Sequence, residues 1–220
     1  MSDVSAADLV RAARQEISAA PPPNRFLDLL EAGRVPSDRL TALAGEQYRI
    51  VGSDRRSFTV LASRFPEPPS GPVFLMLAGG ESEALRLLAD FADALGWGEK
   101  ELRGHRPHPL AQTYPAYLAW SALNGTRSGV GLAMLVNFGE WGGYCARAAD
   151  ALRARYDLSE EAVAFFRFFA ESPPEFAEQA TEMIAVGLAA GDDPAESLHA
   201  AHMMHAYELA FWAALAEGLD

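Results

Sequence analysis

The sequence contains one cysteine, Cys145, among its 220 residues. A single cysteine cannot form an intramolecular disulfide or a zinc site made only of cysteines, which suits a reducing cytoplasm. Basic residues are also scarce, since 18 Lys and Arg stand against 30 Asp and Glu and give a formal net charge of −12 at pH 7. Such a chain repels phosphate backbones and anionic lipids, and no Lys- or Arg-rich run reverses the sign locally. We therefore expect binding to neither nucleic acid nor membranes.

Long apolar runs are absent as well. No run of about 18 apolar residues, the length that indicates a membrane span, occurs in the chain. Residues 1–8 are polar and acidic, unlike a signal peptide, so we expect a cytoplasmic protein. Half of the residues are nevertheless apolar, which is enough to bury a sizeable core. We predict an N-terminal helix with a Pro-rich linker over residues 1–23 and one helical domain over residues 24–220.

The alternation of apolar and polar residues that is typical of strands is missing too. Apolar residues instead recur with a helical period, and Pro and Gly residues mark the ends of the helices. Gly79 and Gly80 predict a kink in the helix that spans residues 73–95. The Phe-rich run 165–169 is predicted to lie in the core. The fold class is therefore all-α. The predicted helices span residues 6–19, 25–32, 37–63, 73–95, 109–123, 129–156, 160–170, 175–188 and 194–219.

The last predicted helix carries a carboxylate, Glu208, in the middle of its apolar face, with His205 at the edge of that face. An isolated buried carboxylate is costly, so it must find hydrogen-bond partners, a cation or a raised pKa. Glu208 is thus a candidate general acid or base, with His205 as a second candidate catalytic residue. The structural alternative is a Glu hydrogen-bonded to a Tyr or to a backbone amide. The apolar neighbours that define the face are Ala201, Met204, Phe211, Trp212 and Leu215.

Two further predicted helices also turn polar groups inward. Gln47 and Asp54 lie within the apolar stripe of helix 37–63. Helix 129–156 contains Gly139, Gly142 and Gly143, which together forfeit about 3 kcal/mol of helix propensity, so close packing of another backbone on this face is expected. The opposite face of that helix is predicted to line a ligand pocket, unless it is simply solvated. Its residues are Asn137, Glu140, Trp141 and Tyr144.

The segment Tyr207-Glu208-Leu209-Ala210-Phe211-Trp212 resembles the closing motif of the TenA/thiaminase II family. The likeness extends to residues 26–51, with Glu46-Gln47-Tyr48, and to residues 114–118 and 133–144. The resemblance implies a haem-oxygenase-like helical bundle of seven to nine helices, a homo-oligomer and a role in thiamine metabolism.

The family's chemistry carries over only in part. Family members use a helix-borne Cys as nucleophile, a C-terminal Glu for proton transfer, an Asp that holds an aminopyrimidine, and aromatic rings that stack on it. Glu208 falls on the Glu and Tyr114 on a pocket Tyr, but Asn137 replaces the Cys and Gln47 replaces the Asp. An amide forms no thiolate adduct, and Cys145 lies about 80° away from Asn137 around the helix. The resemblance therefore implies a TenA-like enzyme that acts on a small planar heterocycle through Glu208, without standard aminopyrimidine hydrolysis.

Two other readings stay open. The same fold resembles that of non-haem di-iron oxidases and of the cofactorless oxidase that completes pyrroloquinoline quinone, so an oxidase is one alternative. A metal centre is disfavoured, because the three-residue spacing of His199, His202 and His205 turns their side chains in different directions. Exposure is expected for the acidic series at 171, 175 and 178 and for the histidines at 105 and 108. We predict no metal and no cofactor; the second alternative is a non-catalytic ligand-binding or regulatory relative.

The apolar content also bears on assembly. Trp97, Trp120 and the apolar segments 73–77 and 165–169 exceed what a single core of this size readily hides. We therefore expect a homo-oligomer, most simply a dimer, that binds a small-molecule ligand. The alternative is a monomer whose core accommodates all of these aromatic residues.

Overall fold

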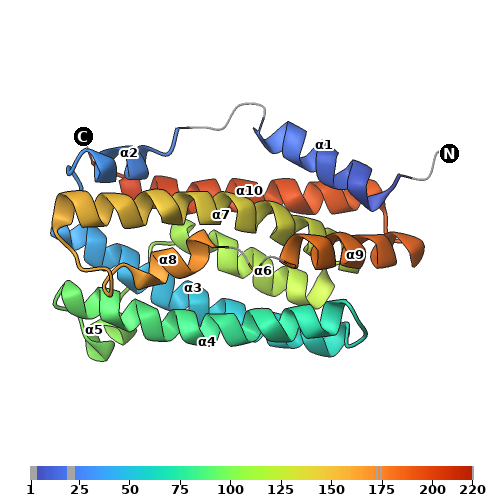
Figure 1. Cartoon of the computed structure of the whole chain (residues 1–220), viewed down its shortest axis with the longest axis horizontal. Helices are drawn as coiled ribbons and strands as arrows, with labels where there is room; N and C mark the ends of the chain where they lie inside the picture. The colour runs from blue at the N-terminus through green and yellow to red at the C-terminus, as the bar shows by residue number, and fades with distance from the viewer. Residues whose placement is uncertain (1–3, 19–22, 172, 174, 220) are drawn as a thin grey trace.

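The computed structural model describes residues 4–18, 23–171, 173 and 175–219. Within these residues the chain forms ten α-helices and one 3-10 helix, and no strand. The all-α prediction is therefore confirmed (Figure 1). The helices are α1 (Ala6–Ser18), α2 (Arg25–Glu31), α3 (Ser37–Arg64), α4 (Ser70–Ala94), α5 (Glu99–Gly104), η1 (Leu110–Gln112), α6 (Thr113–Asn124), α7 (Arg127–Tyr156), α8 (Ala164–Ala170), α9 (Phe176–Ala189) and α10 (Pro194–Ala216).

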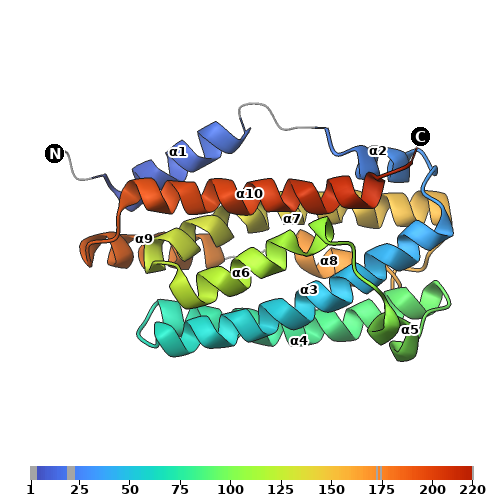
Figure 2. The same cartoon turned by 180° about the vertical axis from the view of Figure 1, so that it is seen from behind.

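Two pairs of long helices form the frame of the bundle. α3 packs along α4 on one side, and α7 packs along α10 on the other (Figures 1 and 2). α6 bridges α3 and α10, while α8 contacts both α4 and α7. The space between the two pairs is therefore closed by these shorter helices. None of the helices in the described part of the chain has the length and apolar character needed to cross a membrane.

The N-terminal helix packs on the bundle. α1 buries Leu9, Val10, Ala13 and Ile17 and contacts α9 and α10. Residues 19–22 of the predicted Pro-rich linker lie outside the described residues. α1 thus extends the core instead of projecting from it.

Some predicted boundaries need correction. Residues 160–163, predicted as the first turn of a helix, form turns, and α8 begins only at Ala164, although the Ser159 hydroxyl does accept the Ala162 N–H at 3.1 Å. α4 is continuous through Gly79 and Gly80. Helix α5 was missed, which accounts for the tenth helix. The sequence feature that could have predicted the start of α5 is Glu101, three residues after Gly98. The Glu101 carboxylate accepts the Gly98 N–H at 3.1 Å and so caps the first turn of the helix.

The loop before α6 is anchored by one buried carboxylate on α3. Glu46 is 2% exposed and accepts the His108 N–H at 2.6 Å. Its carboxylate also bonds the His105 ring at 3.1 Å and the side-chain amide of Gln112. The prediction that His105 is exposed is therefore wrong, because only 13% of its side chain is accessible. Glu46 thus holds the segment that leads into Tyr114 against α3.

The glycines of α7 do not form one packing face. Gly139 and Gly143 are exposed, and a Cβ added at either would meet nothing within 4 Å. Only Gly142 fits the predicted close approach, since a Cβ there would lie 3.1 Å from the Phe169 carbonyl oxygen. The glycine face of α7 was predicted only from the angle between residues around the helix. In the structure α8 covers only part of that face.

These contacts predict opposite effects for two Gly→Ala variants. A Cβ at Gly187 would lie 2.6 Å from the backbone nitrogen of Ser128, so Gly187→Ala should destabilise the protein by about 2 kcal/mol. Gly143→Ala should stabilise it by about 1 kcal/mol, because an exposed helical glycine is replaced without a clash. Chemical denaturation of both variants tests this. Equal shifts would contradict the packing described here.

Candidate active site

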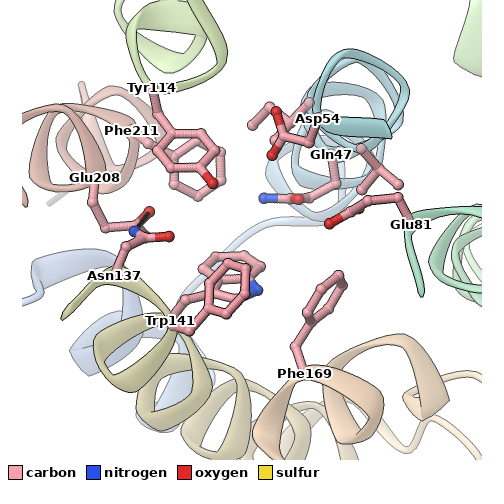
Figure 3. Close-up of a pocket in the computed structure, with 12 residues that line it drawn as sticks. Gln47, Asp54, Glu81, Tyr114, Asn137, Trp141, Phe169, Glu208 and Phe211 are labelled. Atoms are coloured by element: carbon pink, nitrogen blue, oxygen red, sulfur yellow. Dashed lines mark hydrogen bonds between the residues drawn. The ribbon is translucent and has the colours of Figure 1, made fainter. Parts of the chain in front are cut away.

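A cavity lies between the two helix pairs and is lined by side chains from six helices, α3, α4, α6, α7, α8 and α10 (Figure 3). The volume of the cavity is about 30 Å³. The cavity is therefore narrow. Its lining residues are Gln47, Ile50, Val51, Asp54, Glu81, Tyr114, Asn137, Phe138, Trp141, Phe169, Glu208 and Phe211.

One end of the cavity is formed by Glu208 of α10. The carboxylate is buried at 4% exposure, as the apolar stripe predicted. One of its oxygens accepts the indole N–H of Trp212, one turn further along α10, at 2.8 Å. The other accepts the side-chain amide of Asn137 on α7 at 3.2 Å. Two donors from two helices thus fix the orientation of the carboxylate.

The pKa of Glu208 lies near neutral pH. Burial raises its pKa from 4.5 to about 7, while the bonds from Asn137 and Trp212 favour the ionised form and oppose that rise. The charge of Glu140 adds to the increase, and His205 works against it. Near pH 7 the carboxyl group is therefore present in both forms, which is what a general acid or base requires.

The other end of the cavity is acidic. Asp54 of α3 and Glu81 of α4 are both buried, and Figure 3 shows their carboxyl groups with Gln47 across the cavity from Glu208 and Asn137. Burial raises the pKa of Asp54 well above its usual range; the nearby Glu208 charge adds to this, and a hydrogen bond from Tyr114 opposes it. Burial also raises the pKa of Glu81, and the charge of Asp54 reinforces the effect. We call Asp54 and Glu81 the acidic end.

Aromatic rings form the walls between the two ends. The Trp141 ring lies 5.9 Å from that of Phe169 and 6.2 Å from that of Phe211, both in edge-on geometry. Tyr114 and Phe138 complete the aromatic lining. Phe169 was predicted to be core, but it lies at the end of α8 and turns into the cavity. The walls therefore offer flat faces on which a planar ring can stack.

Three of the predicted site residues lie outside the cavity lining. His205 is half-buried and pairs through Nδ1 with the Glu140 carboxylate of α7 at 2.9 Å. Tyr144 packs its ring edge-on against Trp212 at 5.5 Å. His205, Glu140 and Tyr144 are thus absent from the cavity lining, although His205 was predicted as a catalytic residue and Glu140 and Tyr144 as pocket residues. The predicted residues that the structure does bring together in the lining are Gln47, Asp54, Tyr114, Asn137, Trp141 and Glu208.

Glu81 was missed, although its sequence signal is the same as that of Glu208. It lies in a buried stripe of α4 with Phe74, Leu77, Ala84 and Leu88, spaced by three and four residues. The other missed lining residues are apolar and carry no such signal: Ile50, Val51, Phe138, Phe169 and Phe211.

An apolar second cavity of about 340 Å³ adjoins the first between α4, α7 and α8. Its lining shares Glu81, Phe138, Trp141 and Phe169 with the narrow cavity. At its edge lies Phe168, which is partly exposed. The side chains of Trp141 and Phe169 therefore separate a wide apolar space from the polar interior.

The histidines of α10 diverge, as their spacing predicted. His202 bonds Glu16 of α1 at 2.8 Å, His205 bonds Glu140 of α7, and His199 faces α6 near Trp120. Among the described residues no group of three or more His, Cys, Asp and Glu is placed to hold a metal ion.

Comparisons of structure place the chain in a known fold. A TenA homologue from Pseudomonas syringae pv. tomato matches with a TM-score of 0.76 at 10% sequence identity, over 96% of this chain and 91% of that one. A TenA homologue from P. horikoshii matches with a TM-score of 0.72 at 17% identity, over 96% and 98% of the two chains. A domain of unknown function with a haem oxygenase-like fold from Shewanella denitrificans matches with a TM-score of 0.63 at 15% identity, over 96% and 88%.

No protein-family model matches the chain, and no curated protein matches it in sequence. At identities of 10 to 17% the structural likeness establishes the fold alone. The predicted haem-oxygenase-like fold, shared with TenA homologues, is thereby confirmed.

Proposed function

We propose that the protein is a TenA-like enzyme that binds a small planar heterocycle in the narrow cavity and transfers a proton to or from it through Glu208. The proposal rests mainly on the buried carboxyl group of Glu208, which has a pKa of about 7. Asn137 and Trp212 orient this group at one end of the cavity, whose walls are aromatic. The fold shared with TenA homologues supports it at the level of architecture.

The proposed chemistry has no covalent step. Asn137 offers an amide where a nucleophile would be needed, and its nitrogen already donates to Glu208. Cys145 is fully buried outside the cavity lining, and burial raises the pKa of its thiol, which keeps it in the unreactive form. Glu208 instead acts as an acid toward a ring or exocyclic nitrogen, or as a base toward water or the ring, and needs no metal or other cofactor for that step. The cytoplasm remains the predicted location.

We expect a thermal-shift screen of planar nitrogen heterocycles at pH 7 to find ligands for this cavity. A ligand at 100 times its Kd adds about 2.7 kcal/mol of stability. Turnover of a hit should fall about 10²- to 10⁴-fold in Glu208→Gln, because a general acid or base typically contributes that factor, while binding persists. Binding with no turnover in the wild type would favour the non-catalytic alternative.

Hydrolysis of aminopyrimidine or thiamine is expected to be weak or absent, because no thiol lines the cavity. Cys145→Ala should therefore leave any activity unchanged. A robust hydrolysis that a thiol-blocking reagent abolishes through Cys145 would refute the non-covalent route.

We propose in addition that two copies associate. Part of the predicted excess of apolar residues lies in the core, with Phe165 and Phe166 fully buried, but Leu75 of α4 and Trp120 of α6 remain 62% and 54% exposed. Leu123 of α6, next to Trp120 on the helix surface, is 67% exposed. Burial of such a patch in a dimer removes apolar surface from water and is not screened by salt. Light scattering should give a mass near twice 23.7 kDa at low and high salt alike. A monomer at micromolar concentration would exclude the dimer.

A further inference from the structure

We propose that the acidic end of the cavity, Asp54 and Glu81, binds a positively charged organic group, an amidinium or a protonated amine, carried by the ligand. The inference rests on the proposed function for the choice of cavity and names the substrate class: a planar ring with a cationic substituent that lies opposite Glu208.

The first support is that the acidic end is buried and incompletely paired. Asp54 is 4% exposed, and its Oδ1 atom has no hydrogen-bond partner. Glu81 is 7% exposed and lines the same cavity. Both face the cavity (Figure 3). Native proteins rarely leave buried acceptors unsatisfied, so a missing partner inside a cavity points to a ligand.

The second support is the charge of the lining. Three carboxyl groups, those of Asp54, Glu81 and Glu208, face one cavity whose lining residues include no Lys or Arg. Neutral or apolar residues at these positions would give a more stable core, because burial of a carboxyl group without full hydrogen bonding costs free energy, and more so when the group is ionised. A cationic ligand supplies the missing compensation, and each hydrogen bond it donates to a carboxylate is charge-assisted and strong.

The surroundings favour an organic cation over a metal ion. The acidic end offers two carboxyl groups, and no third His, Cys, Asp or Glu among the described residues joins them in a metal-binding arrangement. The neighbouring walls are the rings of Phe138, Trp141 and Phe169. Aromatic faces attract amidinium and ammonium groups through cation–π interactions. A flat cation would therefore find both a charge partner and a stacking surface in the same space.

Binding of a cation should also lower the pKa of both acids. Burial in the empty cavity raises the pKa of Asp54 and of Glu81, and a cation beside the carboxyl groups favours their ionised forms. The other groups that act on them are Tyr114 of α6 and Glu208 of α10 within the cavity, and the exposed Arg56 of α3 outside it.

The test uses benzamidinium and its uncharged isostere benzamide, with EDTA present, on the full-length protein. Benzamidinium should raise the melting temperature in a dose-dependent way and bind at least tenfold more tightly than benzamide. Equal binding of both probes, or no binding of either, would overturn the proposal, as would a larger shift from Mg²⁺ or Zn²⁺ added without EDTA.

Variants separate this proposal from a merely structural role of the two acids. The double variant Asp54→Asn/Glu81→Gln should lose at least tenfold in benzamidinium affinity, keep its benzamide affinity, and melt at a higher temperature than the wild type at pH 8. Glu83→Gln, an exposed acid on the same helix, makes the control for net charge. Glu208→Gln should retain the preference for benzamidinium. A double variant that still prefers benzamidinium would refute the role of the acidic end, whereas loss of turnover in Glu208→Gln concerns the proposed function alone.

Discussion

Replacing Glu46 with alanine is expected to lower the free energy of unfolding by about 3 to 5 kcal/mol. The carboxylate is the shared acceptor for the His108 N–H, the His105 ring and the Gln112 amide. Alanine would leave these part-buried groups without their partner, and each unsatisfied group costs up to about 1–3 kcal/mol where water cannot replace the carboxylate. Losing one partner of a buried charged network has a comparable total cost.

Urea denaturation measures this effect, and two variants serve as controls. Glu46→Gln keeps one acceptor oxygen and should lose less stability than Glu46→Ala. Glu99→Ala removes an exposed ion pair with Arg103 and should shift the unfolding midpoint very little. If Glu46→Ala behaved like Glu99→Ala, Glu46 could not be the anchor of the loop that leads into α6.

The difference in stability between Glu208→Gln and the wild type is expected to grow by about 3 kcal/mol between pH 4.5 and pH 8. The folded-state pKa of Glu208 is raised to about 7 from 4.5. A raised pKa means that the protonated carboxyl group contributes its full stability below pH 4.5 and that this contribution is lost as the pH rises through 7. Glutamine does not titrate, so the variant does not lose stability in this way. The difference between the two pKa values, 4.5 and about 7, corresponds to about 3 kcal/mol of free energy.

The comparison with the variant removes most of the contribution of the neighbouring acids. Asp54 and Glu81 also have raised pKa values and weaken the fold in the same direction, and both are present in the two proteins. The variant changes Asp54 only by removing the part of its pKa shift that comes from the Glu208 charge. The hydrogen bonds are largely preserved, because a glutamine oxygen can accept from Trp212 and its nitrogen can donate to a reoriented Asn137 amide. Parallel stability curves for the two proteins from pH 4.5 to pH 8 would rule out a titrating Glu208.

The sequence was sufficient to predict the all-α bundle and every polar residue of the cavity lining except Glu81. Glu208, Gln47 and Asp54 each interrupt an apolar stripe, and a polar residue on such a stripe is inward-facing whatever the neighbouring helices are. Glu81 gives the same signal in α4 and could have been found by the same reasoning.

What the sequence could not supply was which neighbour each side chain meets. His205 has the angle expected of a residue at the edge of the inner face, yet it meets Glu140 of α7 outside the cavity lining. Phe169 has the character of a core residue, yet at the end of α8 its ring contacts Trp141 at the cavity. A helical angle is a local property, whereas the partner depends on how separate helices pack, and that is set by the whole bundle.

The central claim is that Glu208 is a buried carboxyl group that exchanges its proton near neutral pH inside a ligand cavity. Its most direct test is a ¹³C NMR titration of the glutamate side-chain carboxyl signals from pH 4 to pH 9, with the Glu208→Gln spectrum used to assign the missing signal. The account predicts a midpoint near pH 7 for that signal. A midpoint close to the 4.5 of an ordinary glutamate would contradict it, because Glu208 would then be permanently ionised at neutral pH and unable to act as an acid.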